Sequence, residues 1–148
     1  MWNKLISTSA PAAVILIRIA VGAVFLSEGI QKFLYPLALG AGRFATLGLP
    51  SPEILGPLVA VFEIICGLLV MIGMLTRLAV VPLLVIMVVA IFSTKIPMFA
   101  DKGFWAMAHE SRTDFTMLLA SIFLLLVGSG RLSVDSNFGQ SRRRYRVG

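Results

Sequence analysis

The sequence predicts an all-α integral membrane protein, a bundle of four helices that cross the bilayer with both chain ends on the cytoplasmic side. The first observation is composition: of 148 residues, 58% are hydrophobic and only 14% are charged. A soluble domain of this length cannot bury so much apolar surface. The second observation is the length of the apolar segments, and the third is the distribution of lysine and arginine between the loops.

The first two expected spans contain the charges that lie deepest in the membrane. They cover about residues 12–35 and 54–75, which match the roughly 20 residues of helix that cross the hydrocarbon. Arg18 lies within the first span, and this segment is too long for the apolar region of a signal peptide. We therefore expect a permanent span. Glu63 is the one charged residue of the second span.

The third and fourth expected spans are shorter and are separated by a polar loop. The third covers about residues 78–97 and ends at Pro97, and the fourth covers about residues 113–129. Proline lacks an amide donor and disfavours helix in the residue before it, so the third helix is expected to stop there. The spans form one domain over residues 1–135, followed by a basic cytoplasmic tail over residues 136–148.

Positive charge favours the cytoplasmic side for both chain ends. The side of the ends carries seven cations, which are Lys4, Arg77, Arg131, Arg142, Arg143, Arg144 and Arg146. The other side carries five cations, which are Lys32, Arg43, Lys95, Lys102 and Arg112, together with four acidic residues. The four tail arginines, Arg142, Arg143, Arg144 and Arg146, are expected to contact anionic lipid, since no nucleic-acid motif accompanies them.

The cysteine and histidine counts exclude several kinds of redox centre. A single cysteine, Cys66, allows no disulfide or Cys-x-x-Cys relay within the chain. A single histidine, His109, allows no haem held between two histidines of one chain, and a zinc site lacks ligands. We therefore expect no metal or haem from this chain alone. His109 is either a plain residue of the third loop or a proton-handling group at the membrane surface.

Three charges share one face of the first expected helix. Glu28 and Lys32 lie within about 80° of Arg18 on a wheel of 100° per residue, close to Gly22 and Gly29. Small residues allow close helix packing in membranes, so this face is expected to point into the bundle. Glu28 and Lys32 also have the spacing of a helical ion pair, which either lines a site or only extends toward the headgroups.

Glu63 and Asp114 are the candidate acidic groups of the other helices. Glu63 lies close to the middle of its span, and Arg18 is the one cation well inside the first span, so we expect a contact between them. This contact either fixes helix register or belongs to a polar cavity for a head group or a proton; Glu63 is alternatively protonated and neutral. Asp114 is either a site residue at the outer mouth or a charge favoured at a helix N-terminus.

The order of these motifs resembles the DoxX family of small bacterial membrane proteins, over about residues 15–135. The resemblance is carried by four segments, which are Leu16-Ile17-Arg18, Glu28-Gly29-Ile30-Gln31-Lys32-Phe33, the block over residues 62–77 that includes Phe62-Glu63, and the closing Gly128-Ser129-Gly130-Arg131 with Asp135. It implies a four-helix fold in the bacterial inner membrane. Members are associated with membrane redox systems, and some resemble a subunit of thiosulfate:quinone oxidoreductase.

The resemblance and the charged interior together predict the membrane subunit or accessory of a quinone-linked redox system. A protein partner subunit or a second copy of the chain is expected, and quinone is the expected organic ligand. The residues expected to form a ligand pocket or proton path are Arg18, Glu28, Lys32, Glu63, Asp114 and His109. Two alternatives stay open, which are transport of a small solute or proton and a non-catalytic assembly or anchoring role. Whether the chain is itself an enzyme also stays open.

Overall fold

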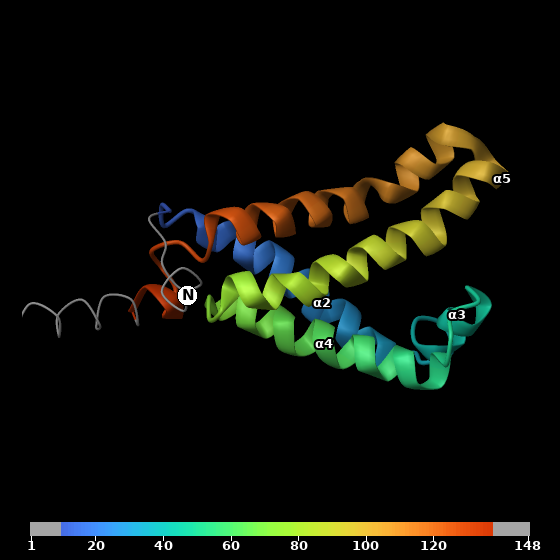
Figure 1. The fold of residues 1–148 in the computed structure, drawn as a ribbon, viewed down its shortest axis with the longest axis horizontal. Coiled ribbons are helices and arrows are strands. Elements are labelled where there is room, and N and C mark those ends of the chain that lie inside the picture. The colour runs from blue at the N-terminus through green and yellow to red at the C-terminus, as the bar shows by residue number, and fades with distance from the viewer. Residues whose placement is uncertain (1–9, 138–148) are drawn as a thin grey trace, which may run out of the picture.

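The computed structural model describes residues 10–137, and every regular element in this range is a helix, which confirms the all-α part of the prediction (Figure 1). The elements are α2 (Val14–Leu34), α3 (Ala41–Thr46), α4 (Pro52–Ile72) and α5 (Thr76–Val127). The first two expected spans agree with α2 and α4 to within a few residues at each end. Lys4 and the tail arginines, Arg142, Arg143, Arg144 and Arg146, lie outside the described residues.

The helix α5 consists of two arms rather than one straight rod. A straight helix of its 52 residues would be about 78 Å long at 1.5 Å per residue, far longer than the roughly 30 Å of hydrocarbon. The backbone leaves helical geometry at Gly103, where φ is 79° and ψ is 175°. Figure 1 shows the chain reversing direction near this point, so that the second arm returns beside the first. A positive φ of this kind is readily adopted by glycine.

The expected end of the third helix at Pro97 is wrong. Pro97 lies inside α5, and the helix continues to the break at Gly103. The expected loop between the third and fourth spans is therefore helical for most of its length. Proline is tolerated inside membrane helices, because neighbouring groups and small local adjustments satisfy the backbone oxygen that it leaves without a donor.

Helices α2 and α4 pack backbone against backbone. A Cβ atom added at Gly22 would lie 2.6 Å from the carbonyl oxygen of Gly67, and one added at Gly67 would lie 2.9 Å from the oxygen of Gly22. Further along α2, a Cβ atom added at Gly29 would lie 2.7 Å from the carbonyl oxygen of Ala60. The expected packing face of small residues is therefore confirmed.

The core lies where α5 packs against the α2 and α4 pair. Its largest fully buried apolar side chains are Val21, Val70, Val80, Leu83 and Leu124. Large apolar side chains also cover the outside of the bundle, as at Leu16, Ile54 and Leu126, each about 70% exposed. Such a surface suits lipid rather than water. By length and composition, three described helices can cross a membrane when α5 is counted once.

Candidate functional site

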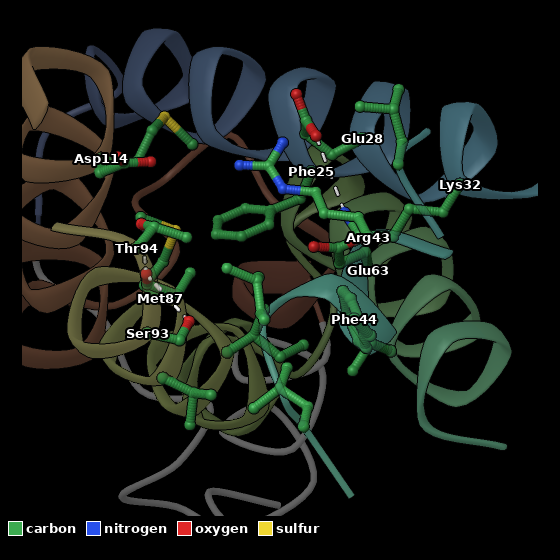
Figure 2. Close-up of a pocket in the computed structure, with 18 of the residues that line it drawn as sticks. Phe25, Glu28, Lys32, Arg43, Phe44, Glu63, Met87, Ser93, Thr94 and Asp114 are labelled. Atoms are coloured by element: carbon green, nitrogen blue, oxygen red, sulfur yellow. Dashed lines mark hydrogen bonds and ion pairs between the residues drawn. The ribbon is translucent and has the colours of Figure 1, made fainter. Parts of the chain in front are cut away.

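A cavity of about 570 Å³ lies between the α2 and α4 pair, the α3 segment and both arms of α5 (Figure 2). Its lining residues belong to the end of the bundle that holds α3 and the Gly103 turn. Figure 1 shows the arms of α5 diverging from α2 and α4 toward this end. Much of its wall is apolar and includes Val24, Phe25, Leu55, Val59, Val85, Met87 and Met117. Its polar lining residues are Glu28, Lys32, Arg43, Glu63, Ser93, Thr94, Lys95, Glu110, Thr113 and Asp114.

One wall of the cavity carries two carboxylates that share a single ammonium group. The Nζ atom of Lys32 lies 2.7 Å from Oε2 of Glu63 and 3.7 Å from Oε2 of Glu28. The Glu63 side chain is only 4% exposed, whereas that of Glu28 is 51% exposed. The predicted Glu28 and Lys32 ion pair is confirmed, and Lys32 links an accessible carboxylate to a buried one.

A second ion pair lies on the α5 side of the cavity. The Nζ atom of Lys95, on the first arm, lies 2.9 Å from Oδ2 of Asp114 on the second arm. Lys95 also donates a hydrogen bond of 3.4 Å to the backbone oxygen of Glu110. Asp114 therefore joins the two arms beside the cavity. Charge pairing across helices in an apolar setting is expected where the groups face the bundle interior.

The expected contact between Arg18 and Glu63 is wrong. The Arg18 guanidinium donates to the backbone oxygens of Val70 at 3.0 Å, Met71 at 2.8 Å, Ser129 at 2.7 Å and Leu132 at 2.6 Å. Glu63 is seven residues from Val70 on α4, or roughly 10 Å along the helix axis. Because α2 and α4 run antiparallel, Arg18 lies level with the end of α4 and Lys32 lies level with Glu63.

The end of the bundle around Arg18 is held by contacts between charged side chains and backbone. The last carbonyls of a helix have no partner within it and carry partial negative charge, which makes them good acceptors for Arg18. Asp135 accepts hydrogen bonds from the amides of Leu75 at 2.8 Å and Thr76 at 3.2 Å, at the start of α5. Arg77 donates to the carbonyl oxygen of Leu125 at 3.2 Å, near the end of α5.

The structure brings four of the six expected site residues together. Glu28, Lys32, Glu63 and Asp114 line the cavity, whereas Arg18 and His109 are not among the lining residues. His109 is exposed on the second arm of α5 and contacts Arg112, with 3.1 Å between Nε2 and the guanidinium. Within residues 10–137, no three His, Cys, Asp or Glu side chains gather into a group that could hold a metal ion.

Sequence reasoning missed two basic residues of the cavity. Lys95 and Arg43 were counted only as cations on one side of the membrane, yet both line the cavity. The sequence contains a feature that marks each of these two residues. Lys95 follows Ser93 and Thr94 at the end of an apolar run, and Arg43 is the single charge of the segment over residues 35–51.

Comparison with known proteins gives the family. The DoxX family profile matches residues 13–96, which is more than half of the chain. The chain belongs to the DoxX family. This DoxX chain is 51% identical over 140 residues to the uncharacterized membrane protein Rv3486 of Mycobacterium tuberculosis, covering 90% of this chain and 86% of the relative. No solved structure matches it.

A more distant DoxX relative carries a name that mentions an activity. The Bacillus subtilis protein named "Putative oxidoreductase CatD" is 31% identical over 123 residues, covering 82% of this chain and 83% of the relative. The family match and the two relatives together identify a multi-pass membrane protein of the DoxX family, as the sequence motifs predicted.

Proposed function

We propose that this DoxX protein is the membrane subunit or accessory of a quinone-linked redox system and that it holds the quinone head group in the cavity. The observation that carries the proposal is an apolar cavity with an ion-paired cluster on each of two sides, Glu28, Lys32 and Glu63 on one and Lys95 and Asp114 on the other. The apolar wall suits a flat ring, and the ammonium groups suit carbonyl oxygens that accept hydrogen bonds.

The chemistry assigned to the chain is binding and proton exchange. A bound quinone supplies the redox chemistry, because it takes up two electrons and two protons to become a quinol. In this proposal a partner redox subunit supplies the electrons, and the carboxyl groups beside the cavity exchange the protons. The exposed Glu28 and the buried Glu63 both contact Lys32, so a proton taken up at Glu28 has a short route inward. The name of the Bacillus subtilis relative is consistent with such a redox role.

We further propose that the chain crosses the bacterial inner membrane four times, with both ends in the cytoplasm. The reversal of α5 near Gly103 supports two crossings by this helix. The described residues Arg77 and Arg131 belong to the Arg18 end, while Lys102 and Arg112 lie near the opposite turn, together with acidic residues. A fluorescent reporter after residue 148 and a periplasmic phosphatase inserted near Gly103 are both expected to be active. A phosphatase that is active when it is fused to the C-terminus would instead indicate the opposite orientation.

Binding of a short quinone is the experiment that tests the proposed function. The full chain is purified in nanodiscs, any bound quinone is extracted and identified, and the affinity for menadione is measured by equilibrium dialysis. Replacing Glu63 with Gln is expected to weaken menadione binding about tenfold, since Lys32 then loses its buried partner and reorients. The matched control is Glu53→Gln, an exposed glutamate of the same helix. Equal affinity in both variants would contradict the proposal.

The two alternative functions give different results in the same preparation. Transport requires a polar path through the bundle, yet the core between the cavity and Arg18 is formed by apolar residues such as Val21, Val80 and Leu83. A proton flux into liposomes that Glu63→Gln abolishes would favour transport. The assembly role predicts no bound quinone and loss of a partner enzyme from membranes that lack this chain.

A further inference from the structure

Helix α3 holds a single arginine at the edge of the cavity. Arg43 lines the cavity together with its apolar neighbours Leu39, Phe44, Leu47 and Leu49. The helix is fixed against α4, because a Cβ atom added at Gly56 would lie 2.8 Å from the backbone nitrogen of Ala41. Its turn is closed by a hydrogen bond of 3.0 Å from the Leu49 amide to the Phe44 oxygen. Arg43 therefore extends from a segment that is held in place by its packing on α4 and by its own backbone hydrogen bond.

The guanidinium of Arg43 differs from the other cations of the cavity in having no acceptor among the residues that the structure describes. Lys32 and Lys95 each contact a carboxylate, but the Arg43 guanidinium makes no hydrogen bond or ion pair with any residue in the range 10–137. Figure 2 shows it pointing from α3 into the cavity, toward the space between the two ion-paired walls. A guanidinium stays charged at all ordinary pH and presents a planar fork of donors, so it favours an oxygen that carries negative charge.

The charges of the cavity also indicate where such an oxygen would lie. Lys95 and Asp114 neutralise each other, and Glu28 and Glu63 outnumber Lys32 on the α2 and α4 wall. An anionic oxygen is repelled by that acidic wall and attracted by Arg43, so it would face α3. Glu110, on the second arm of α5, is the remaining acidic lining residue and is exposed.

We propose that Arg43 makes the cavity selective for quinones that carry an ionised acidic oxygen, such as hydroxyquinones, over neutral quinones of the same size. This inference rests on the proposed function and adds the charge class of the ligand. Charged hydrogen bonds are stronger than neutral ones, and a preference of about tenfold is expected for the anionic ligand. A neutral quinone binds through the apolar wall and through hydrogen bonds from Lys32 and Lys95 to its carbonyl oxygens, and these contacts do not involve Arg43.

Two naphthoquinones of similar size test the selectivity. Lawsone is a hydroxynaphthoquinone that is ionised at neutral pH, and menadione is the uncharged methyl analogue. The affinity of each is measured for the wild type, Arg43→Gln, Arg43→Lys and the control Arg131→Gln, an exposed arginine remote from the cavity. The wild type and the control are expected to prefer lawsone about tenfold. Arg43→Gln should lose this preference with menadione affinity unchanged, and Arg43→Lys should keep part of it.

The outcomes separate this inference from the function on which it rests. If menadione binds and the ratio of the two affinities is the same in Arg43→Gln as in the wild type, the selectivity role is wrong while the quinone site stands. If neither ligand binds the wild type, both proposals fail. Glu110→Gln should strengthen lawsone binding modestly by removing a negative charge. If Glu110→Gln and Arg43→Gln each weakened the binding of lawsone and menadione equally, these two residues would instead have a structural role in shaping the cavity. That result would overturn the proposal.

Discussion

The two ends of the bundle use charged residues in opposite ways. Near Arg18, a buried guanidinium donates to four backbone oxygens, so its partners are part of the fold itself. Around the cavity, Lys32 and Lys95 contact carboxylate side chains beside open volume. Side-chain partners can be exchanged for a ligand at small structural cost, whereas backbone partners cannot. The partner of a charged side chain inside the membrane therefore indicates whether that side chain has a structural or a functional role. Its depth in the membrane is a poorer guide.

Removal of the Arg18 side chain should have the largest effect on stability. Arg18→Met leaves four backbone oxygens without this donor in a site where Arg18 is only 2% exposed. We expect a loss of about 3–5 kcal/mol in the free energy of unfolding, measured by SDS titration in mixed micelles. The remaining folded protein should bind menadione with wild-type affinity. Arg131→Met, at an exposed arginine, is the control, and equal stability of the two variants would refute the structural role.

A large side chain at Gly22, between α2 and α4, should have the next largest effect on stability. Gly22→Leu forces a side chain against the backbone oxygen of Gly67, which lies only 2.6 Å from the position of a Cβ atom. Overpacking of this kind costs about 1–3 kcal/mol and should lower the melting temperature in detergent. The control is Ala20→Leu, which adds the same side chain at an exposed position of the same helix. Unchanged melting of Gly22→Leu would show that the helices are not in close contact.

The ion pair between the arms of α5 should contribute least to stability. A double-mutant cycle with Lys95→Met and Asp114→Asn is expected to give a coupling free energy of about 1 kcal/mol. Both single variants should remain folded but bind menadione more weakly, unlike Arg18→Met. Lys102→Met and Asp101→Asn, exposed residues of the same helix, supply the matched controls. A coupling free energy larger than the loss of unfolding free energy in Arg18→Met would contradict the assignment of the structural role to the Arg18 end.

The sequence predicted the helices better than it predicted their charged contacts. Hydropathy identified α2 and α4, and the spacing of Gly22 and Gly29 indicated that α2 packs closely on another helix. The same helical wheel could not pair Arg18 correctly, because a wheel gives the face of a residue but not its level against an antiparallel neighbour.

The turn of α5 and the cavity residues Arg43 and Lys95 depended on tertiary structure. Pro97 is a local breaker, but the chain reverses at Gly103, where positive φ is required. Lys95 meets Asp114 only because the two arms of α5 lie together. Arg43 joins the cavity because α3 packs on α4 near Gly56, a contact between segments that no periodic pattern describes.

Photoaffinity labelling with an azidoquinone tests most directly whether the cavity end, and not the Arg18 end, binds the ligand. The full chain in nanodiscs is irradiated with and without excess menadione, and the labelled peptides are identified by mass spectrometry. We expect labels that menadione suppresses within residues 24–32, 85–95 or 113–117, three segments that contain lining residues of the cavity. Labels that menadione suppresses around Arg18 and Ser129, with none in the cavity peptides, would contradict binding at the cavity end.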